Sequence, residues 1–227
     1  MNFFVIEGLD GSGKTTQIEL LKKFLSKKNI KTRYIHFPDY NSPIFGELIT
    51  KFLRGELGSI NDVNPYLVAL LYAGDRNNAK DKIKQWQKEG YFVIADRYTY
   101  SNIAYQSVKI ENNSKRKEFM EWIFNMEFNY FKIPKPNLNI YLDVPFSFVK
   151  ENLKKRALNE QREYLNGKKD IHEEDFSFQK KVYEMYNEIL RTFSDIVPIR
   201  CYNQANNSIL SMDEISKEII KKVEEFL

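Results

Sequence analysis

Eight residues near the start of the chain restrict its possible folds more than any other feature. The segment Gly8-Leu9-Asp10-Gly11-Ser12-Gly13-Lys14-Thr15 matches the pattern G-x-x-x-x-G-K-[S/T] and directly follows the apolar run Phe3–Ile6. An amphipathic helical pattern then begins at Thr16. This strand–loop–helix context predicts a phosphate-binding loop, in which backbone N–H groups and a helix N-terminus hold phosphate oxygens. We therefore expect the chain to bind a nucleoside triphosphate.

Strand and helix signals alternate along the whole chain, which predicts an α/β fold. Strands are expected over Asn2–Glu7, Lys31–Phe37, Tyr91–Ala95, Leu138–Val144 and Ile196–Tyr202. Helices are expected over Thr16–Lys28, Ser42–Leu53 with Ser42 as N-cap, Val63–Lys88 with a bend near Gly74, Lys115–Phe131, Pro145–Arg156, Glu174–Arg191 and Met212–Phe226. Because β-α-β connections are right-handed and place helices over a sheet, this order predicts a five-stranded parallel sheet with helices on both faces. We expect one domain over residues 1–227.

Composition narrows the class of protein further. The 35 basic residues exceed the 31 acidic ones by only four, so charge alone does not indicate a nucleic-acid partner. Cys201 is the single cysteine, which excludes an intramolecular disulfide and favours a reducing compartment. No apolar run reaches the 18 residues of a membrane span. We therefore expect a cytoplasmic protein with no membrane and no nucleic-acid partner.

A second motif follows the predicted central strand. Asp96 ends this strand, where a carboxylate can face Mg²⁺ beside the phosphates, and Arg97 comes next on the same crevice. The D-x-x-G and N-K-x-D elements of GTP-binding switches do not occur at suitable places. The polar segment over residues 157–172 lacks apolar periodicity. It is interpreted either as an ordinary solvated connection or as a lid that brings cations over bound phosphates.

Four segments together resemble the thymidylate kinase family: Gly8–Gln17, Phe37–Tyr40, Tyr72–Arg76 and Asp96–Gln106. The resemblance runs from Met1 to about Arg191 in the family's order and spacing. It implies a P-loop NTPase fold like that of nucleoside monophosphate kinases. It also implies an enzyme that uses ATP and Mg²⁺ to convert dTMP to dTDP for dTTP biosynthesis.

The resemblance also assigns roles to individual residues. ATP would be bound by Gly8, Leu9, Asp10, Gly11, Ser12, Gly13, Lys14, Thr15 and Thr16. Lys14 and Arg97 would be catalytic, and Thr15 and Asp96 would hold the metal. The acceptor dTMP would contact Asp10, Phe37, Tyr40, Leu53, Tyr72, Arg76, Arg97, Ser101, Asn102 and Tyr105. Within this set, Arg76 would donate to a thymine carbonyl and Tyr105 would pack under the sugar. We also expect the Phe37–Pro38 peptide bond to be cis.

Two further expectations concern the lid. Some family members carry an arginine inside the phosphate loop, where this chain has Gly11 and Ser12. Members without it use lid arginines, as in a bacterial-like type, so Arg156 and Arg162 become the catalytic candidates. Glu173 matches a lid-flanking acid and is a candidate metal ligand.

Apolar residues also cover more than one face of two predicted helices. Val63–Ala73 is apolar nearly all round, and the Lys115–Phe131 helix carries Phe119, Met120, Trp122, Ile123, Phe124, Met126, Phe128, Tyr130 and Phe131. A helix buried on all sides lies either in a deep core or against a partner. Since the family is typically homodimeric, these helices are the candidate interface.

Two alternative functions stay open on the sequence alone. The first is another deoxynucleoside or nucleotide kinase. A deoxynucleoside kinase needs a carboxylate that accepts the proton of a sugar hydroxyl, and in the Phe37–Tyr40 segment only Asp39 is available. The second is a nucleotide-switched binding ATPase, which would hydrolyse its nucleotide to exchange partners.

Overall fold

The sheet has five strands, all parallel, in the order β2-β3-β1-β4-β5. In a computed structural model of the chain, the described residues are 2–60, 62–159, 165, 170–206 and 208–227. The strands are β1 (Phe3–Glu7), β2 (Thr32–His36), β3 (Phe92–Asp96), β4 (Leu138–Asp143) and β5 (Ile196–Arg200). This confirms the predicted α/β fold, and it places β1, which leads into the phosphate loop, at the centre of the sheet.

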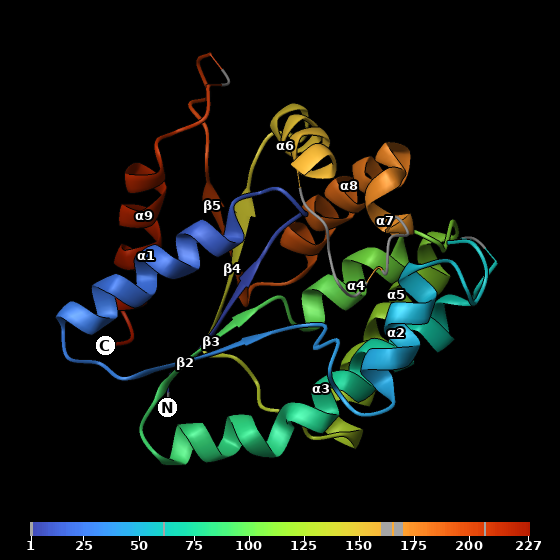
Figure 1. Cartoon of the computed structure of the whole chain (residues 1–227), viewed down its shortest axis with the longest axis horizontal. Coiled ribbons are helices and arrows are strands. Elements are labelled where there is room, and N and C mark those ends of the chain that lie inside the picture. Colours follow the sequence, from blue (N-terminus) through green and yellow to red (C-terminus); the bar gives the residue numbers. More distant parts are fainter. Residues whose placement is uncertain (1, 61, 160–164, 166–169, 207) are drawn as a thin grey trace.

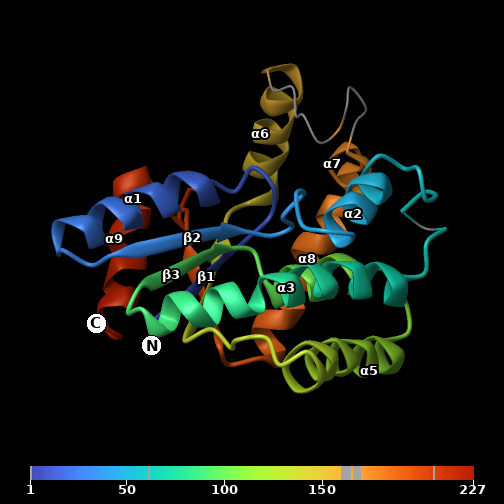
Figure 2. The ribbon, with the colours of Figure 1, turned by 60° about the horizontal axis from the view of Figure 1, so that its bottom comes forward.

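Helices cover both faces of the sheet (Figures 1 and 2). They are α1 (Lys14–Lys27), α2 (Phe45–Leu53), α3 (Pro65–Lys88), α4 (Thr99–Ser107), α5 (Asn113–Phe124), the π-helical turn η1 (Asn125–Tyr130), α6 (Phe146–Asn159), α7 (Ile171–Glu174), α8 (Phe176–Thr192) and α9 (Met212–Glu224). The helices α1 and α9 lie side by side over one face, and α3, α4 and α8 lie over the other (Figure 2). Across the described residues, no helix combines the length and the apolar content that a bilayer crossing requires.

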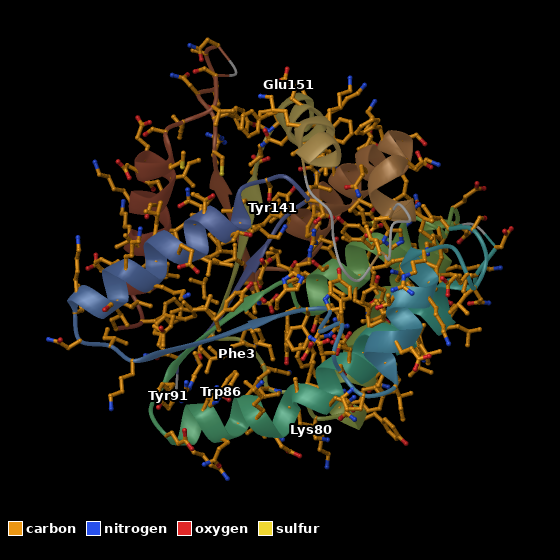
Figure 3. All side chains as sticks on the ribbon, viewed as in Figure 1. Phe3, Lys80, Trp86, Tyr91, Tyr141 and Glu151 are labelled. Atoms are coloured by element: carbon orange, nitrogen blue, oxygen red, sulfur yellow. The ribbon has the colours of Figure 1, made fainter. Side chains whose placement is uncertain are left out.

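Alternate residues of the central strands point into two separate cores. Phe4 and Ile6 belong to a core with side chains of α1 and α9 that also extends to α4, α5 and α8, whereas Phe3 and Val5 belong to a smaller core with side chains of α3. Figure 3 shows Phe3 and Trp86 of α3 on this second side. Since both faces of β1 are buried, its sequence is a continuous apolar run, as expected for a central parallel strand.

The second predicted helix begins later than expected. Its N-cap is Ile44, with a positive φ of 65°, and not Ser42. The Ser42 hydroxyl accepts a hydrogen bond from Asn78 of α3 at 3.0 Å, so it ties this turn to α3 and does not cap α2. The Phe37–Pro38 peptide bond, which precedes this turn, is cis as expected.

The long helix α3 runs through Gly74 without interruption. A Cβ atom at Gly74 would lie 2.3 Å from the ring of Phe45 in α2, so the glycine makes room for a neighbouring aromatic ring. The helix α4 was not foreseen at all. All nine of its residues are buried, so it has no polar face and no amphipathic periodicity by which to detect it.

Candidate active site

A cavity of about 690 Å³ opens at the carboxyl ends of β1, β2 and β3. Every residue expected to bind the acceptor nucleotide lines it: Asp10, Phe37, Tyr40, Leu53, Tyr72, Arg76, Arg97, Ser101, Asn102 and Tyr105. Six of the nine expected ATP-binding residues line it too: Asp10, Gly11, Gly13, Lys14, Thr15 and Thr16. Gly8, Leu9 and Ser12 belong to the same loop but are not among its lining residues. Segments that lie far apart in the sequence, from Asp10 to His172, therefore form one site.

The phosphate loop connects β1 to α1 and depends on its glycines. Gly8, Gly11 and Gly13 all have positive φ, at 152°, 78° and 89°. These conformations suit glycine because a Cβ atom would be strained there. The Lys14 ammonium donates to the carbonyl oxygens of Gly8 and Leu9, at 3.2 and 2.9 Å. Burial, together with the nearby charge of Arg97, lowers the pKa of Lys14.

Arg97 is held at the mouth of the loop by three side chains. It forms an ion pair with Asp10 at 2.9 Å, and it donates to the hydroxyl of Ser101 at 2.9 Å and to that of Tyr105 at 3.4 Å. The Tyr105 hydroxyl in turn donates to Asp10 at 3.0 Å. Burial raises the pKa of Asp10, but the charges of Arg97 and Lys14 outweigh it and hold that pKa below its usual range. The cluster is thus a charged carboxylate among cations.

Glu7 hydrogen-bonds Ser101 of this cluster, and the sequence analysis did not identify it. It is fully buried at the end of β1 and accepts hydrogen bonds from the hydroxyl groups of Ser101 and Tyr186 and from the Tyr98 N–H. Burial raises the pKa of Glu7. The sequence did contain a signal for this role. Glu7 ends an apolar strand directly before the loop, and a buried carboxylate requires hydrogen-bond partners.

A second arginine, Arg76 of α3, also lines the cavity. It is 2% exposed and forms a two-pronged ion pair with the fully buried Glu127 of η1. Arg76 Nε and Nη2 donate to the two carboxylate oxygens at 2.7 and 2.5 Å. Glu127 also accepts from Thr99 at 2.8 Å and from Asn102 at 3.0 Å. It too was missed, although it lies four residues after the buried Ile123, on the apolar face of the predicted helix.

The expected metal ligands are only partly described. Thr15 and Asp96 line the same cavity. Asp96 lies 3.5 Å from the ring nitrogen Nδ1 of His36, and its Oδ1 atom is buried without a hydrogen-bond partner among the described residues. Burial raises the pKa of Asp96, but the hydrogen bond with His36 and the charge of Lys14 outweigh burial. The net pKa is therefore below its usual value, and this carboxylate is charged at neutral pH. In the described part of the chain, no group of three or more acidic, histidine or cysteine side chains is arranged so that it could hold a metal ion.

The expected lid residues fall where little is described. Arg162 lies outside the described residues, and so does most of the segment 157–172. Arg156 belongs to α6 and Glu173 to α7, but their side chains are outside the described set. Two described residues of α6 line the cavity, Lys155 and Asn152, and the Asn152 amide donates to the Gly11 carbonyl at 2.8 Å. The cavity therefore reaches the start of the expected lid.

Two further residues of the cavity were missed. Gln106 is completely buried, and neither its amide oxygen nor its amide nitrogen has a partner among the described residues. His172 of α7 is stacked on Phe178 with ring centroids 5.0 Å apart, and burial lowers its pKa to about 3. The imidazole is therefore neutral at physiological pH. Both residues bring further polar atoms to the cavity wall.

These features define a class of protein. A phosphate loop, an arginine at the end of the adjacent strand and several aromatic rings in the same cavity are typical of P-loop phosphotransferases that act on a small acceptor. In particular, residues 6–214 match the family model described as thymidylate kinase, and the chain belongs to that family.

Individual relatives agree with this assignment. The chain is 37% identical over 188 residues to a probable thymidylate kinase of Pyrobaculum aerophilum, covering 82% of this chain and 81% of the relative. It is 33% identical to that of Thermococcus onnurineus, covering 98% and 97%, and 28% identical to the thymidylate kinase of Plasmodium falciparum, covering 86% and 90%. The structure of thymidylate kinase from Candida albicans superposes with a TM-score of 0.71 at 25% identity, covering 99% of this chain and 91% of that one.

The protein is therefore an enzyme that phosphorylates dTMP to dTDP, as the sequence analysis predicted. The family also implies ATP as the phosphate donor. The relatives described above are archaeal and eukaryotic, so the bacterial-like type expected from the sequence is not established by them.

Proposed function

We propose that the cavity at the ends of β1 and β3 holds dTMP and the phosphates of ATP side by side. The observation that carries this proposal is the meeting of Lys14, Arg97 and the aromatic pocket in one cavity. Lys14 would contact the β- and γ-phosphates of ATP, and Arg97 would hold the phosphate of dTMP. Tyr40 lines the same part of the cavity and would contact that phosphate too.

The chemistry requires charge and position more than it requires a base. The second pKa of a phosphate monoester is about 6, so the acceptor is already an anionic nucleophile at neutral pH. The difficulty is to bring two anions together, which depends on orientation and charge stabilisation. Lys14 and Arg97 supply positive charge at the two phosphates, and Asp10 keeps the Arg97 side chain in place at 2.9 Å until the acceptor arrives.

The residues present also suit Mg²⁺. Carboxylate and hydroxyl oxygens are the ligands that this ion prefers, and both Asp96 and Thr15 face the cavity. The unpartnered Asp96 Oδ1 atom is what a ligand or a metal-bound water would satisfy. When bound, the ion would neutralise part of the triphosphate charge. Glu173 stays a candidate ligand.

The base and sugar would occupy the aromatic half of the cavity. Phe37 and Leu53 would wall the base and Tyr72 would stack on it, since all three line the cavity. Arg76, Ser101 and Asn102 would supply polar contacts. Tyr105, beside Asp10 at 3.0 Å, would lie under the sugar and disfavour a 2′-hydroxyl. The buried amide of Gln106 is a further polar group at this end.

The transferring phosphate would receive its remaining charge from the lid. Because Gly11 and Ser12 provide no cation within the loop, Arg156 and Arg162 remain the proposed catalytic arginines of a bacterial-like type. Lys155 supports this role because it is exposed and lines the cavity, so the part of α6 next to Arg156 reaches the site. The segment 157–172 would then act as the lid of a single domain.

We further propose a cytoplasmic homodimer. On α3, the side chains of Tyr66, Leu67 and Leu70 are 40%, 60% and 39% exposed and form a stripe at helical spacing. Tyr66 also packs edge-on against Trp122 of α5, with ring centroids 4.8 Å apart. Other residues first considered for the interface, among them Phe119, Met120 and Ile123, belong to the core, so α3 carries most of this proposal.

A screen of acceptors tests the proposed site. ADP formation from ATP should be fastest with dTMP, slower with dUMP, far slower with dCMP, and negligible without an acceptor. Arg76 is a donor only, so it suits the O4 carbonyl of thymine and not the amino group of cytosine. The thymine methyl contributes only about 1–3 kcal/mol. Arg76→Ala should remove most of the preference over dCMP. Equal kcat/KM for dCMP and dTMP in the wild type would contradict the base-site assignment.

A further inference from the structure

Glu127 makes more hydrogen bonds than an ion pair requires. Its two carboxylate oxygens accept four: two from Arg76, one from the Thr99 hydroxyl and one from the Asn102 amide. The side chain is completely buried and projects from η1, a π-helical turn, of the kind often found at functional sites. Two of its partners, Arg76 and Asn102, line the cavity, whereas Thr99 does not. Glu127 therefore hydrogen-bonds two residues of the cavity wall and is not itself a lining residue.

The orientation of the Asn102 amide follows from these contacts. Its Nδ2 atom lies 3.0 Å from Glu127 Oε1 and 3.0 Å from the Ala69 carbonyl oxygen. Both neighbours can only accept hydrogen bonds. A flipped amide would therefore place the Asn102 oxygen against these two acceptor oxygens, with no hydrogen between them. The Oδ1 atom is therefore the free end, and it is buried with no partner among the described residues. Asn102 offers the cavity an acceptor.

Arg76 is oriented by the same carboxylate. Its Nε and Nη2 atoms are used by Glu127, and the hydrogen bonds of the described residues leave Nη1 for the cavity. Arg76 Nη2 and Asn102 Nδ2 donate to the same oxygen, Glu127 Oε1, at 2.5 and 3.0 Å. The two side chains are therefore immediate neighbours, and they present a donor next to an acceptor.

We propose that Glu127 sets the base selectivity of the enzyme by fixing Arg76 as a donor and Asn102 as an acceptor. The inference rests on the proposed base site. Thymine and uracil present the complementary edge, with O4 as acceptor and N3–H as donor. Cytosine presents the reverse, an amino donor and an N3 acceptor, so both protein groups would stay unpaired. A buried site of this kind rejects the wrong partner strongly because its polar groups lose their hydrogen bonds.

Replacement of one oxygen tests the proposal. In Glu127→Gln, an N–H group replaces one acceptor, so at least one arm of Arg76 loses its partner in either amide orientation. We expect the ratio of kcat/KM for dTMP to that for dCMP to fall roughly 10- to 100-fold, mainly through loss of dTMP activity. Thr99→Val is the matched control. It removes one hydrogen bond from the same carboxylate but leaves Arg76 and Asn102 in place, so the ratio should stay within about twofold.

The outcomes separate this inference from the proposed base site. If the wild type does not prefer dTMP over dCMP, the base site itself is wrong. If the wild type is selective and folded Glu127→Gln keeps the full ratio, Glu127 does not set selectivity. A merely structural role would lower activity on both acceptors in parallel, which overturns the proposal in the same way. Glu127→Asp is the second variant if Glu127→Gln does not fold, because it keeps the charge opposite Arg76 and withdraws the carboxylate by one methylene.

Discussion

The two arginines of the active-site cavity are held by carboxylates in contrasting ways. At the proposed base end, the Arg76 and Glu127 side chains are 2% and 0% exposed and meet through two hydrogen bonds. At the phosphate end, the Arg97 and Asp10 side chains are 9% and 23% exposed and meet through one short contact. The first pair is a closed unit of the protein interior. The second pair is open to an incoming anion.

This difference matches what each end has to do. Hydrogen-bond recognition of a base requires groups that are rigid before the ligand arrives. Capture of a phosphate requires cations whose charge is not fully satisfied in the empty site. Lys14, Arg97 and Asp10 lie together there, and the pKa of Lys14 is lowered by burial and by its like-charged neighbour Arg97. In the proposed site, the charges at the base end therefore stabilise the protein, and those at the phosphate end would bind the ligand.

The largest expected effect comes from the phosphate end. Lys14→Ala should lower kcat by at least about 10²–10³-fold, because it removes a charge-stabilising donor from the transferring group. Unfolding in urea should change little, since Lys14 donates only to two loop carbonyls among the described residues. Lys22→Ala, on the same helix but paired with Glu19 at the surface, is the control and should keep normal turnover. Near-normal kcat in Lys14→Ala would contradict the phosphate-loop assignment.

At the proposed base end, by contrast, we expect a substitution to lower the stability of the fold. Glu127→Ala should lower the free energy of unfolding by about 3–5 kcal/mol, because it leaves the buried Arg76 charge without its partner. Chemical denaturation measures this directly. The matched variant Glu47→Ala breaks a surface pair with Lys51, and it should change the free energy of unfolding little, because exposed ion pairs are screened by solvent. A loss at Glu127 as small as that at Glu47 would show that the base end is not the closed unit described above.

The smallest expected effect concerns Asp75, the neighbour of Arg76 in the sequence. Asp75 accepts a hydrogen bond from the Asp39 N–H at 2.9 Å, and burial raises its pKa from 3.8 to about 6. The folded state therefore binds more protons than the unfolded state between these values, so stability falls as the pH rises from about 4 to about 6. Over this range, the contribution of Asp75 amounts to about 1–3 kcal/mol.

The variant Asp75→Asn isolates this contribution, because an amide can still accept from Asp39 but does not ionise. The variant should be more stable than the wild type at pH 7, and the difference should vanish near pH 4. The measurement is urea unfolding of both proteins at the two values. A difference that is independent of pH would assign the effect to packing and not to ionisation.

Lys14, Asp96 and Arg97 were predictable from the sequence because their motifs lie at strand ends, whereas the residues expected to bind the base were implied by the family resemblance. Lys14 begins α1 after the loop that follows β1, Arg97 directly follows β3, and the carboxyl ends of parallel strands meet at one edge of a sheet. The buried supports were not predictable in the same way. Glu7 meets Ser101 across 94 residues, and Glu127 meets Arg76 across 51, so the pairing depends on a strand order that periodicity does not reveal.

Local structure shows a similar limit. The helix α4 carries Ser101, Asn102 and Tyr105, yet it was not predicted, because every side chain in it is buried. The Ser42 cap was predicted by residue type, but its hydroxyl bonds to Asn78 of α3 instead. In both cases a contact between distant segments outweighs the local preference. These contacts surround the cavity, so the site was harder to foresee in detail than the sheet.

The single cysteine has a practical consequence for studying the molecule in solution. Cys201 is 1% exposed, and burial raises the pKa of its thiol to about 12. The thiolate is the nucleophile that attacks alkylating reagents, so this side chain should be almost inert toward them at neutral pH. A cysteine introduced at an exposed position such as Ile44, which is 70% exposed and lies just before α2, would then be the one reactive thiol of the chain. A fluorescent or spin label could be attached there without altering the native cysteine, and it would report on the start of α2, the helix whose Leu53 lines the cavity.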